Sequence, residues 1–175
     1  MRIIAGTHRG HRISAPKGTS TRPTSDRVRE SVFNILGPLD GAATIDLFAG
    51  SGALGLEALS RGAASCLFVE SDREACRTIG ENLDKLRFDG RARVLCDDVL
   101  RVLDRGHERF ELVLCDPPYD YARRDRLAPA LARVVAPGGV IVWESAGRED
   151  PPEVPGIELR TSRRYGSGRL TVFDA

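Results

Sequence analysis

The ten residues from Asp46 to Gly55 read DLFAGSGALG and decide the fold. They overlap a short apolar run, Thr44–Phe48, and three of them are glycines with the G-x-G-x-x-G spacing. Such a loop joins a buried strand to a helix, because glycines let the backbone turn tightly and approach a bound nucleotide. The stretch therefore predicts a strand, a ligand-binding turn and a helix, which together form the first unit of an α/β fold.

The same alternation continues along the chain. Short runs rich in Val, Leu, Ile or Phe have the length of buried strands, and helical spacing separates them. A capping-box pattern, Ser71-x-x-Glu74, opens one of these helices, and Leu127 and Leu131 share one face of another. The predicted strands are Thr44–Phe48, Cys66–Glu70, Arg93–Cys96, Leu112–Cys115 and Val140–Trp143.

Strands that alternate with helices predict an open, doubly wound, mainly parallel sheet of the Rossmann-like type, with ligands beyond the carboxyl ends of the strands. The alternation stops after the fifth strand. Ile157–Thr161 and Arg169–Phe173 flank the turn YGSG at 165–168, so we expect a closing antiparallel hairpin and seven strands in all. A second, smaller hairpin is expected at the N-terminus from Arg2–Ala5 and His11–Ala15.

The composition of the 175 residues is that of one compact domain, with 41% hydrophobic residues and 29% charged residues. No apolar run reaches the roughly 20 residues of a membrane helix, and no signal peptide is visible. We therefore expect a cytoplasmic monomer without a membrane partner. The cysteines lack the spacing of a metal site or a disulfide framework, so no metal is expected and we interpret them as buried thiols. They are Cys66, Cys76, Cys96 and Cys115.

Charge is unevenly distributed, because residues 1–30 carry a net charge of +5 and the rest of the chain carries −4. We expect residues 1–25 to form a basic RNA-binding extension and residues 26–175 to form the main domain. A basic segment of this kind often contacts a phosphate backbone, although some of its arginines are equally suited to pairing with neighbouring acids on a solvated helix face. The candidate RNA-binding residues are Arg9, Arg12, Arg22, Arg27 and Arg29.

The glycine loop is compatible with two cofactors, NAD and S-adenosylmethionine. Glu70 stands 20 residues after Gly50, where an acid can accept both hydrogen bonds of a ribose diol, as in NAD-dependent dehydrogenases. Asp46 favours the other cofactor, because a carboxylate beside the loop repels a pyrophosphate but suits the cationic end of S-adenosylmethionine. Asp46 as a simple helix-capping carboxylate is the structural alternative.

A carboxylate after the third predicted strand is placed to accept from an adenine amine, and we prefer Asp98 to Asp97 for this role. The pair lies at the same predicted edge of the sheet as the glycine loop. The candidate cofactor-binding residues are Asp46, Phe48, Ala49, Gly50, Ser51, Gly52, Glu70 and Asp98.

The fourth predicted strand ends in Asp116-Pro117-Pro118-Tyr119, the candidate catalytic tetrad. Prolines carry no N–H, so we expect the backbone carbonyls of this tetrad to be rigid acceptors without competing donors. A pocket of acceptors recognises an amine. The Asp116 carboxylate and the Pro117 carbonyl are suited to bind the two hydrogens of an exocyclic NH₂, while Tyr119 offers a stacking face for the base.

These residues resemble class I S-adenosylmethionine-dependent methyltransferases that modify exocyclic amines. More narrowly, the chain is similar to the RsmD family over most of its length. The motifs that narrow the resemblance are MRIIAG at 1–6, RG at 9–10, RPT at 22–24, DRVRE at 26–30 and GALGLEALSR at 52–61. No family motif covers Gly147–Gly156, and no role is assigned to that segment.

The resemblance implies methyl transfer from S-adenosylmethionine to N2 of one guanine in 16S ribosomal RNA, within a partly assembled 30S subunit. It implies that Asp46 to Gly52, Glu70 and Asp98 surround the cofactor and that Asp116 to Tyr119 surround the base. An adenine-N6 DNA or RNA methyltransferase would use the same tetrad. A nicotinamide dehydrogenase and a non-catalytic RNA-binding module are the remaining alternatives.

Overall fold

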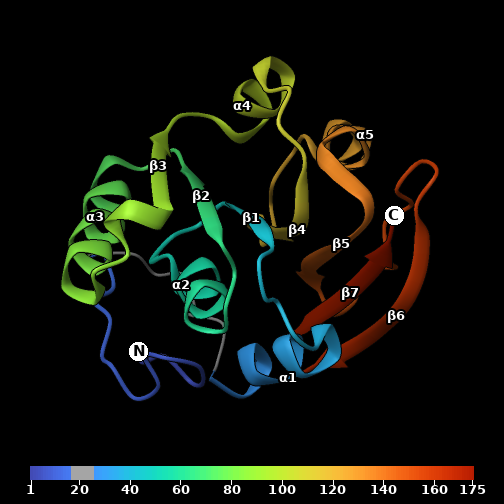
Figure 1. Cartoon of the computed structure of the whole chain (residues 1–175). Helices are drawn as coiled ribbons and strands as arrows, with labels where there is room; N and C mark the ends of the chain where they lie inside the picture. The colour runs from blue at the N-terminus through green and yellow to red at the C-terminus, as the bar shows by residue number, and fades with distance from the viewer. Residues whose placement is uncertain (17–25) are drawn as a thin grey trace.

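The computed structural model describes residues 1–16 and 26–175, and its centre is a seven-stranded sheet with the order β3-β2-β1-β4-β5-β7-β6 (Figure 1). The first five strands are parallel, and β7 is antiparallel to both of its neighbours. The predicted Rossmann-like sheet and its closing hairpin are confirmed. The strands are β1 Ala43–Leu47, β2 Ser65–Glu70, β3 Ala92–Cys96, β4 Phe110–Cys115, β5 Val135–Ala146, β6 Glu158–Tyr165 and β7 Gly168–Asp174.

Helices cover both faces of the sheet, as the two-sided burial of β4 shows. Leu112 and Leu114 pack against α1 and α2, whereas Val113 and Cys115 point to the opposite face and pack against α4 and α5. Alternate side chains of a strand point to opposite faces, so a strand apolar at every position has to be covered twice. The helices are α1 Asp26–Leu36, α2 Ala53–Ser60, α3 Arg73–Leu86, α4 Val99–Arg105 and α5 Arg124–Val134, with a short 3₁₀ helix at Asp89–Arg91.

Three local predictions are corrected. The N-cap of α3 is Asp72, whose carboxylate accepts a hydrogen bond of 2.8 Å from the Ala75 N–H, so the expected cap at Ser71 is wrong by one residue. Strand β5 begins at Val135, five residues before the predicted start, because the chain passes through Gly138 at φ +75° and continues the ladder with a register shift. The expected N-terminal hairpin is present but shorter than predicted: Arg2 and Arg12 form one antiparallel bridge, flanked by hydrogen bonds from the Ile3 N–H to the His11 carbonyl at 2.9 Å and from the Ile13 N–H to the Met1 carbonyl at 3.1 Å.

The cysteine prediction holds in part. Cys66 and Cys115 are buried, and burial raises the pKa of both thiols. Cys76 is half-buried, and Cys96 is exposed because it ends the edge strand β3, so the expectation of four buried thiols is wrong for these two. In the described residues each helix is too short or too polar to cross a lipid bilayer.

A buried carboxylate, Glu57 of α2, fastens the N-terminal segment to the domain. It accepts hydrogen bonds from the N–H groups of Ile4 at 2.7 Å and Ala5 at 3.0 Å. The Arg61 guanidinium lies 2.7 Å from it and the Arg29 guanidinium 3.8 Å from it. Because ion pairs and backbone donors surround this carboxylate on several sides, the first residues of the chain have a fixed place against α2.

Close packing of α2 on β2 requires glycine at position 55. A Cβ added to Gly55 would lie 2.4 Å from Cε1 of Phe68 and 2.7 Å from Sγ of Cys66, and both side chains are buried. By contrast, a Cβ at Gly80 in α3 would meet nothing within 4 Å.

We predict that Gly55→Ala lowers the free energy of unfolding by about 1–3 kcal/mol, because the added methyl overpacks the contact between α2 and β2. Gly80→Ala is the matched control, and its better helix propensity should leave stability unchanged or raise it by up to about 1 kcal/mol. Urea unfolding of the two variants and the parent measures the difference. Equal stability of both variants would contradict the proposed packing constraint.

Candidate active site

The chain leaves β1 through a glycine loop, residues 48–52, that is held in an uncommon backbone conformation. The φ angles are positive at Phe48 (59°), Gly50 (55°) and Gly52 (78°). Glycine adopts this region freely, whereas Phe48 does so only under strain imposed by its surroundings. The Phe48 ring packs edge-on against Tyr121, with 4.9 Å between the ring centroids. The strained turn thus places an aromatic ring beside the loop that the sequence assigns to a cofactor.

Asp46 lies within β1 and is almost fully buried. Its Oδ2 accepts a hydrogen bond of 2.8 Å from the N–H of Gly55, in the first turn of α2. Burial raises the pKa of Asp46 to about 8; the bond from Gly55 opposes this shift, and the negative charges of Asp116 and Glu70 add to it. One carboxylate oxygen of Asp46 therefore caps α2, in agreement with the alternative interpretation of Asp46 as a helix-capping residue. The same carboxyl group lies at the strand-end site.

Glu70 ends β2 and ties two loops together. Its Oε2 accepts from the Gly50 N–H at 2.8 Å, and its Oε1 accepts from the N–H groups of Ser71 at 2.7 Å and Asp72 at 2.9 Å. A ribose diol bound by this carboxylate would replace or share these backbone donors. The predicted partner of the glycine loop is thus in contact with that loop.

The tetrad follows β4 on the other side of β1. Pro117 is buried, whereas the Tyr119 side chain is 46% exposed. The Pro118 carbonyl accepts from the Tyr121 N–H at 2.9 Å and from the Arg124 guanidinium at 3.1 Å. The expectation that the tetrad's carbonyls have no competing donors is therefore wrong for Pro118, and it is also wrong for Tyr119, whose carbonyl accepts from Arg124. No donor among residues 1–16 and 26–175 bonds to the Pro117 carbonyl, the one assigned to the amine.

Sequence reasoning missed the clamp that holds the tetrad. Arg124, at the start of α5, donates to the carbonyls of Pro118 and Tyr119, the latter at 2.8 Å, and also pairs with Glu149. Glu149 lies in the Gly147–Gly156 segment, which had no assigned role. Arg124 and Glu149 are 25 positions apart and neither lies in a motif, so no local pattern in the sequence predicts their contact.

Asp98 lies at the same edge of the sheet, but its carboxylate already has partners. It caps α4 by accepting from the Arg101 N–H at 3.1 Å, and it pairs with Arg123. Partial burial acts to raise the pKa of Asp98, but the bonds from Arg123 and Arg101 outweigh it and hold the pKa below its ordinary value. Asp97 pairs with Arg101 at 3.1 Å, as expected of a carboxylate on a solvated face.

Between the glycine loop and Asp98 stands Tyr121, which the sequence analysis did not select. Its ring contacts Phe48, and the Arg123 guanidinium lies over it, 5.4 Å from its centroid. The Tyr121 hydroxyl is buried and makes no hydrogen bond to the described residues. Because a buried hydroxyl without a partner is costly, this atom is suited to a polar group of a bound ligand.

The basic residues assigned to RNA divide into three groups. Arg9, Arg12 and Arg27 are exposed, and Arg22 lies outside the described residues. The assignment of Arg29 is wrong: its side chain is 1% exposed, it bonds to Asp26 at 2.8 Å, and it lies beside the buried Glu57. Burial lowers the pKa of Arg29, and the two carboxylates oppose this shift.

Comparisons with known proteins show which proteins this chain is similar to. A family model described as conserved hypothetical protein 95 matches residues 1–174. The "Putative rRNA methyltransferase YlbH" of Bacillus subtilis is 38% identical over 99% of this chain and 98% of its own length. The ribosomal RNA small subunit methyltransferase D of Escherichia coli is 43% identical over 68% of this chain and 60% of its own length. The solved structure of "Putative methyltransferase yhhF" from Escherichia coli superposes with a TM-score of 0.90 at 35% identity, covering 99% of this chain and 97% of that one.

The raised pKa of Asp46 makes stability depend on pH in a defined direction. A carboxyl whose pKa is about 8 in the folded state, against an ordinary 3.8, adds stability that is complete below about pH 4 and is lost as the pH rises through about 8.

We predict that Asp46→Asn removes this dependence, because the amide oxygen still accepts from the Gly55 N–H but the side chain does not ionise. Urea unfolding between about pH 5 and about pH 9 should show stability falling with pH in the parent, by at most about 1.4 kcal/mol per pH unit from this group, and falling less in the variant. Parallel pH profiles of the two proteins would contradict a buried, protonated Asp46.

Proposed function

Because the chain belongs to the RsmD family of methyltransferases, we propose that it transfers a methyl group from S-adenosylmethionine to the exocyclic N2 amine of guanine 966 in 16S rRNA of the small ribosomal subunit. The observation that carries the proposal is the meeting of Asp46, Glu70 and Asp116 at one edge of the sheet, because Leu47 pairs with Val69 on one side and with Cys115 on the other. A site built from carboxylates favours a cationic ligand and an amine substrate.

The residues present fit S-adenosylmethionine. When bound, this cofactor supplies a methyl group made electrophilic by a positively charged sulfur. We assign its binding to the glycine loop, Asp46, Glu70 and Asp98, and the unpartnered hydroxyl of Tyr121 offers one further polar contact. A nicotinamide dinucleotide fits less well, because the Gly50 N–H is already bonded to Glu70, and the negative charges of Glu70 and Asp116 at this edge of the sheet would repel its pyrophosphate.

The tetrad is suited to hold and orient the base. The Asp116 carboxylate and the Pro117 carbonyl accept the two hydrogens of the amine, and the exposed ring of Tyr119 stacks on the purine. The methylated amine carries a surplus proton, which we assign to the Asp116 carboxylate or to water. Arg124 and Glu149 act as positioning residues, because the Arg124 guanidinium donates to the carbonyls of Pro118 and Tyr119 and Glu149 pairs with Arg124.

RNA binding is assigned to exposed arginines of the N-terminal region, namely Arg9, Arg12 and Arg27, together with Arg22 of the segment not described. Contacts with phosphates give affinity that falls with salt but carries little sequence information. We retain residues 1–25 as an RNA-binding extension of a methyltransferase domain at 26–175. The expected setting is the cytoplasm, with a monomer acting on a partly assembled 30S subunit.

Methylation in vitro tests the reaction, the base and the form of the substrate together. The substrates are naked 16S rRNA and partly assembled 30S particles from a strain without this activity, with a DNA duplex as a third arm. Nucleoside mass analysis and mapping should find N2-methylguanosine at one site. N6-methyladenosine in either nucleic acid would instead establish the adenine-directed alternative, and absence of transferred methyl with binding of NAD would establish the dehydrogenase.

We predict that Asp116→Ala abolishes methyl transfer and leaves the Kd for S-adenosylmethionine within about twofold, because Asp116 is assigned to the base. Asp116→Asn is the matched control: it keeps one acceptor but loses the charge, so it should retain a small residual rate. Calorimetric titration of the cofactor and a labelled-methyl assay separate the two roles. Lost cofactor affinity with retained turnover would overturn the assignment.

A further inference from the structure

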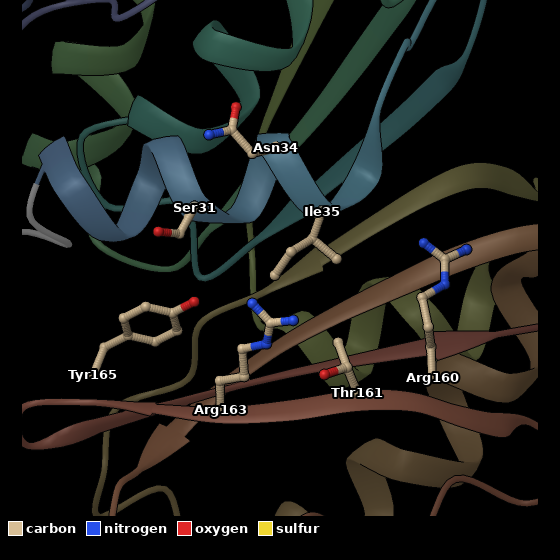
Figure 2. A pocket seen from close by; sticks show the side chains of 7 residues that line it. All are labelled: Ser31, Asn34, Ile35, Arg160, Thr161, Arg163 and Tyr165. Atoms are coloured by element: carbon tan, nitrogen blue, oxygen red, sulfur yellow. The ribbon is translucent and has the colours of Figure 1, made fainter.

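A groove with no assigned role lies between α1 and the edge strand β6, and its volume is about 550 Å³ (Figure 2). Arg160 and Arg163 extend from β6 toward α1, and the Ile35 side chain extends from α1 toward β6. None of the lining residues belongs to the glycine loop or to the tetrad. They are Ser31, Asn34 and Ile35 of α1 and Arg160, Thr161, Arg163 and Tyr165 of β6.

The lining combines cations with hydrogen-bond donors and contains no carboxylate. Arg160 pairs with Asp174 outside the groove. Arg163 differs, because its exposed guanidinium forms no ion pair with any residue that the structure describes. An unpaired guanidinium beside hydroxyl and amide groups has the chemistry of a phosphate-binding site.

The groove leads toward the candidate active site. Tyr165 lies at one end of the groove. The hairpin turn that follows it leads to Gly168, which pairs with Ala146 at the end of β5. A Cβ on Gly168 would lie 3.1 Å from the Tyr119 hydroxyl, so this turn touches the tetrad. Arg163 is two residues from Tyr165 on the same face of β6, a separation of about 7 Å along the strand.

Helix α1 extends the same surface. Figure 2 shows Ser31 over Tyr165 and Ile35 over Arg163, so the N-terminal end of α1 lies at the end of the groove that is nearer the tetrad. Arg27 stands one helical turn before Ser31 and is exposed. Residues four apart share a helix face, so this cation continues the line of donors toward the site.

We propose that the groove between α1 and β6 binds the phosphodiester backbone of the rRNA strand that carries the target nucleotide, with Arg163 as its main phosphate ligand. This inference rests on the proposed function, since it names the surface that leads the substrate to the tetrad. A strand held here enters the site past the hairpin turn and Tyr119. The half-buried ring of Tyr165 gives one flat face for an unpaired base beside that path.

The test compares Arg163→Ala with Arg164→Ala. Arg164 is the matched control, because it is the next residue of β6, is exposed and points to the opposite face of the sheet. Filter binding of unmodified 16S rRNA and of partly assembled 30S particles is measured between about 50 and 200 mM salt, together with KM and kcat for labelled-methyl transfer. Cofactor affinity and thermal unfolding show that both variants are intact.

Arg163→Ala should weaken binding of both RNA substrates about tenfold, raise their KM to match, leave kcat and cofactor affinity unchanged, and lower the salt slope by about one. Arg164→Ala should stay within about twofold of the parent. Equal RNA affinities and equal salt slopes for the two variants would contradict the proposal that the groove binds RNA. Weaker binding of the 30S particles alone would also overturn it, because the groove would then contact a ribosomal protein. Binding is measured separately from turnover. A parent protein that transfers no methyl group to rRNA would contradict the proposed function, whereas the binding data alone test whether the groove holds RNA.

Discussion

The bond between the Asp46 carboxylate and the Gly55 N–H fixes the geometry on which the site depends. It joins the buried strand β1 to the first turn of α2, and three of the five loop residues between these elements, Phe48, Gly50 and Gly52, have positive φ angles. Sheet register does the rest. Leu47 pairs with Val69 on one side and with Cys115 on the other, so the residues that follow, Glu70 and Asp116, emerge level with the glycine loop.

This register concentrates negative charge where water is scarce. The protein tolerates it because Glu70 is bonded to three backbone N–H groups and because Asp46 is held protonated up to about pH 8. A cationic ligand would relieve the same repulsion, which is why this edge of the sheet favours a sulfonium over a pyrophosphate. The exposed arginines assigned to RNA lie elsewhere, on α1, β6 and the N-terminal segment. Under the proposed function, the RNA and the cationic cofactor would therefore bind to separate surfaces of one small domain.

The sequence predicted those features that are encoded locally. Strand runs, the glycine loop and the tetrad each sit in a short stretch with its own pattern, so their positions were confirmed within a few residues. Features made by distant residues were not predictable. Arg124 and Glu149 are brought together only by the packing of α5, and the choice between Asp72 and Ser71 as helix cap depends on backbone geometry. Arg29 was assigned to RNA because charge alone does not reveal which face of a helix is buried.

The correction at Arg29 explains why α1 lies where it does. The buried carboxylate of Glu57 needs a positive partner, and α1 supplies Arg29. The Arg29 guanidinium also donates a hydrogen bond of 2.6 Å to the Arg2 carbonyl. Buried ion pairs add little net stability, but they penalise any arrangement that leaves one partner alone. One face of α1 is thus fixed against α2 and the N-terminal segment. The opposite face, with Arg27 and Ser31, then has a set distance from β6, so the groove is a consequence of the charge buried behind the helix.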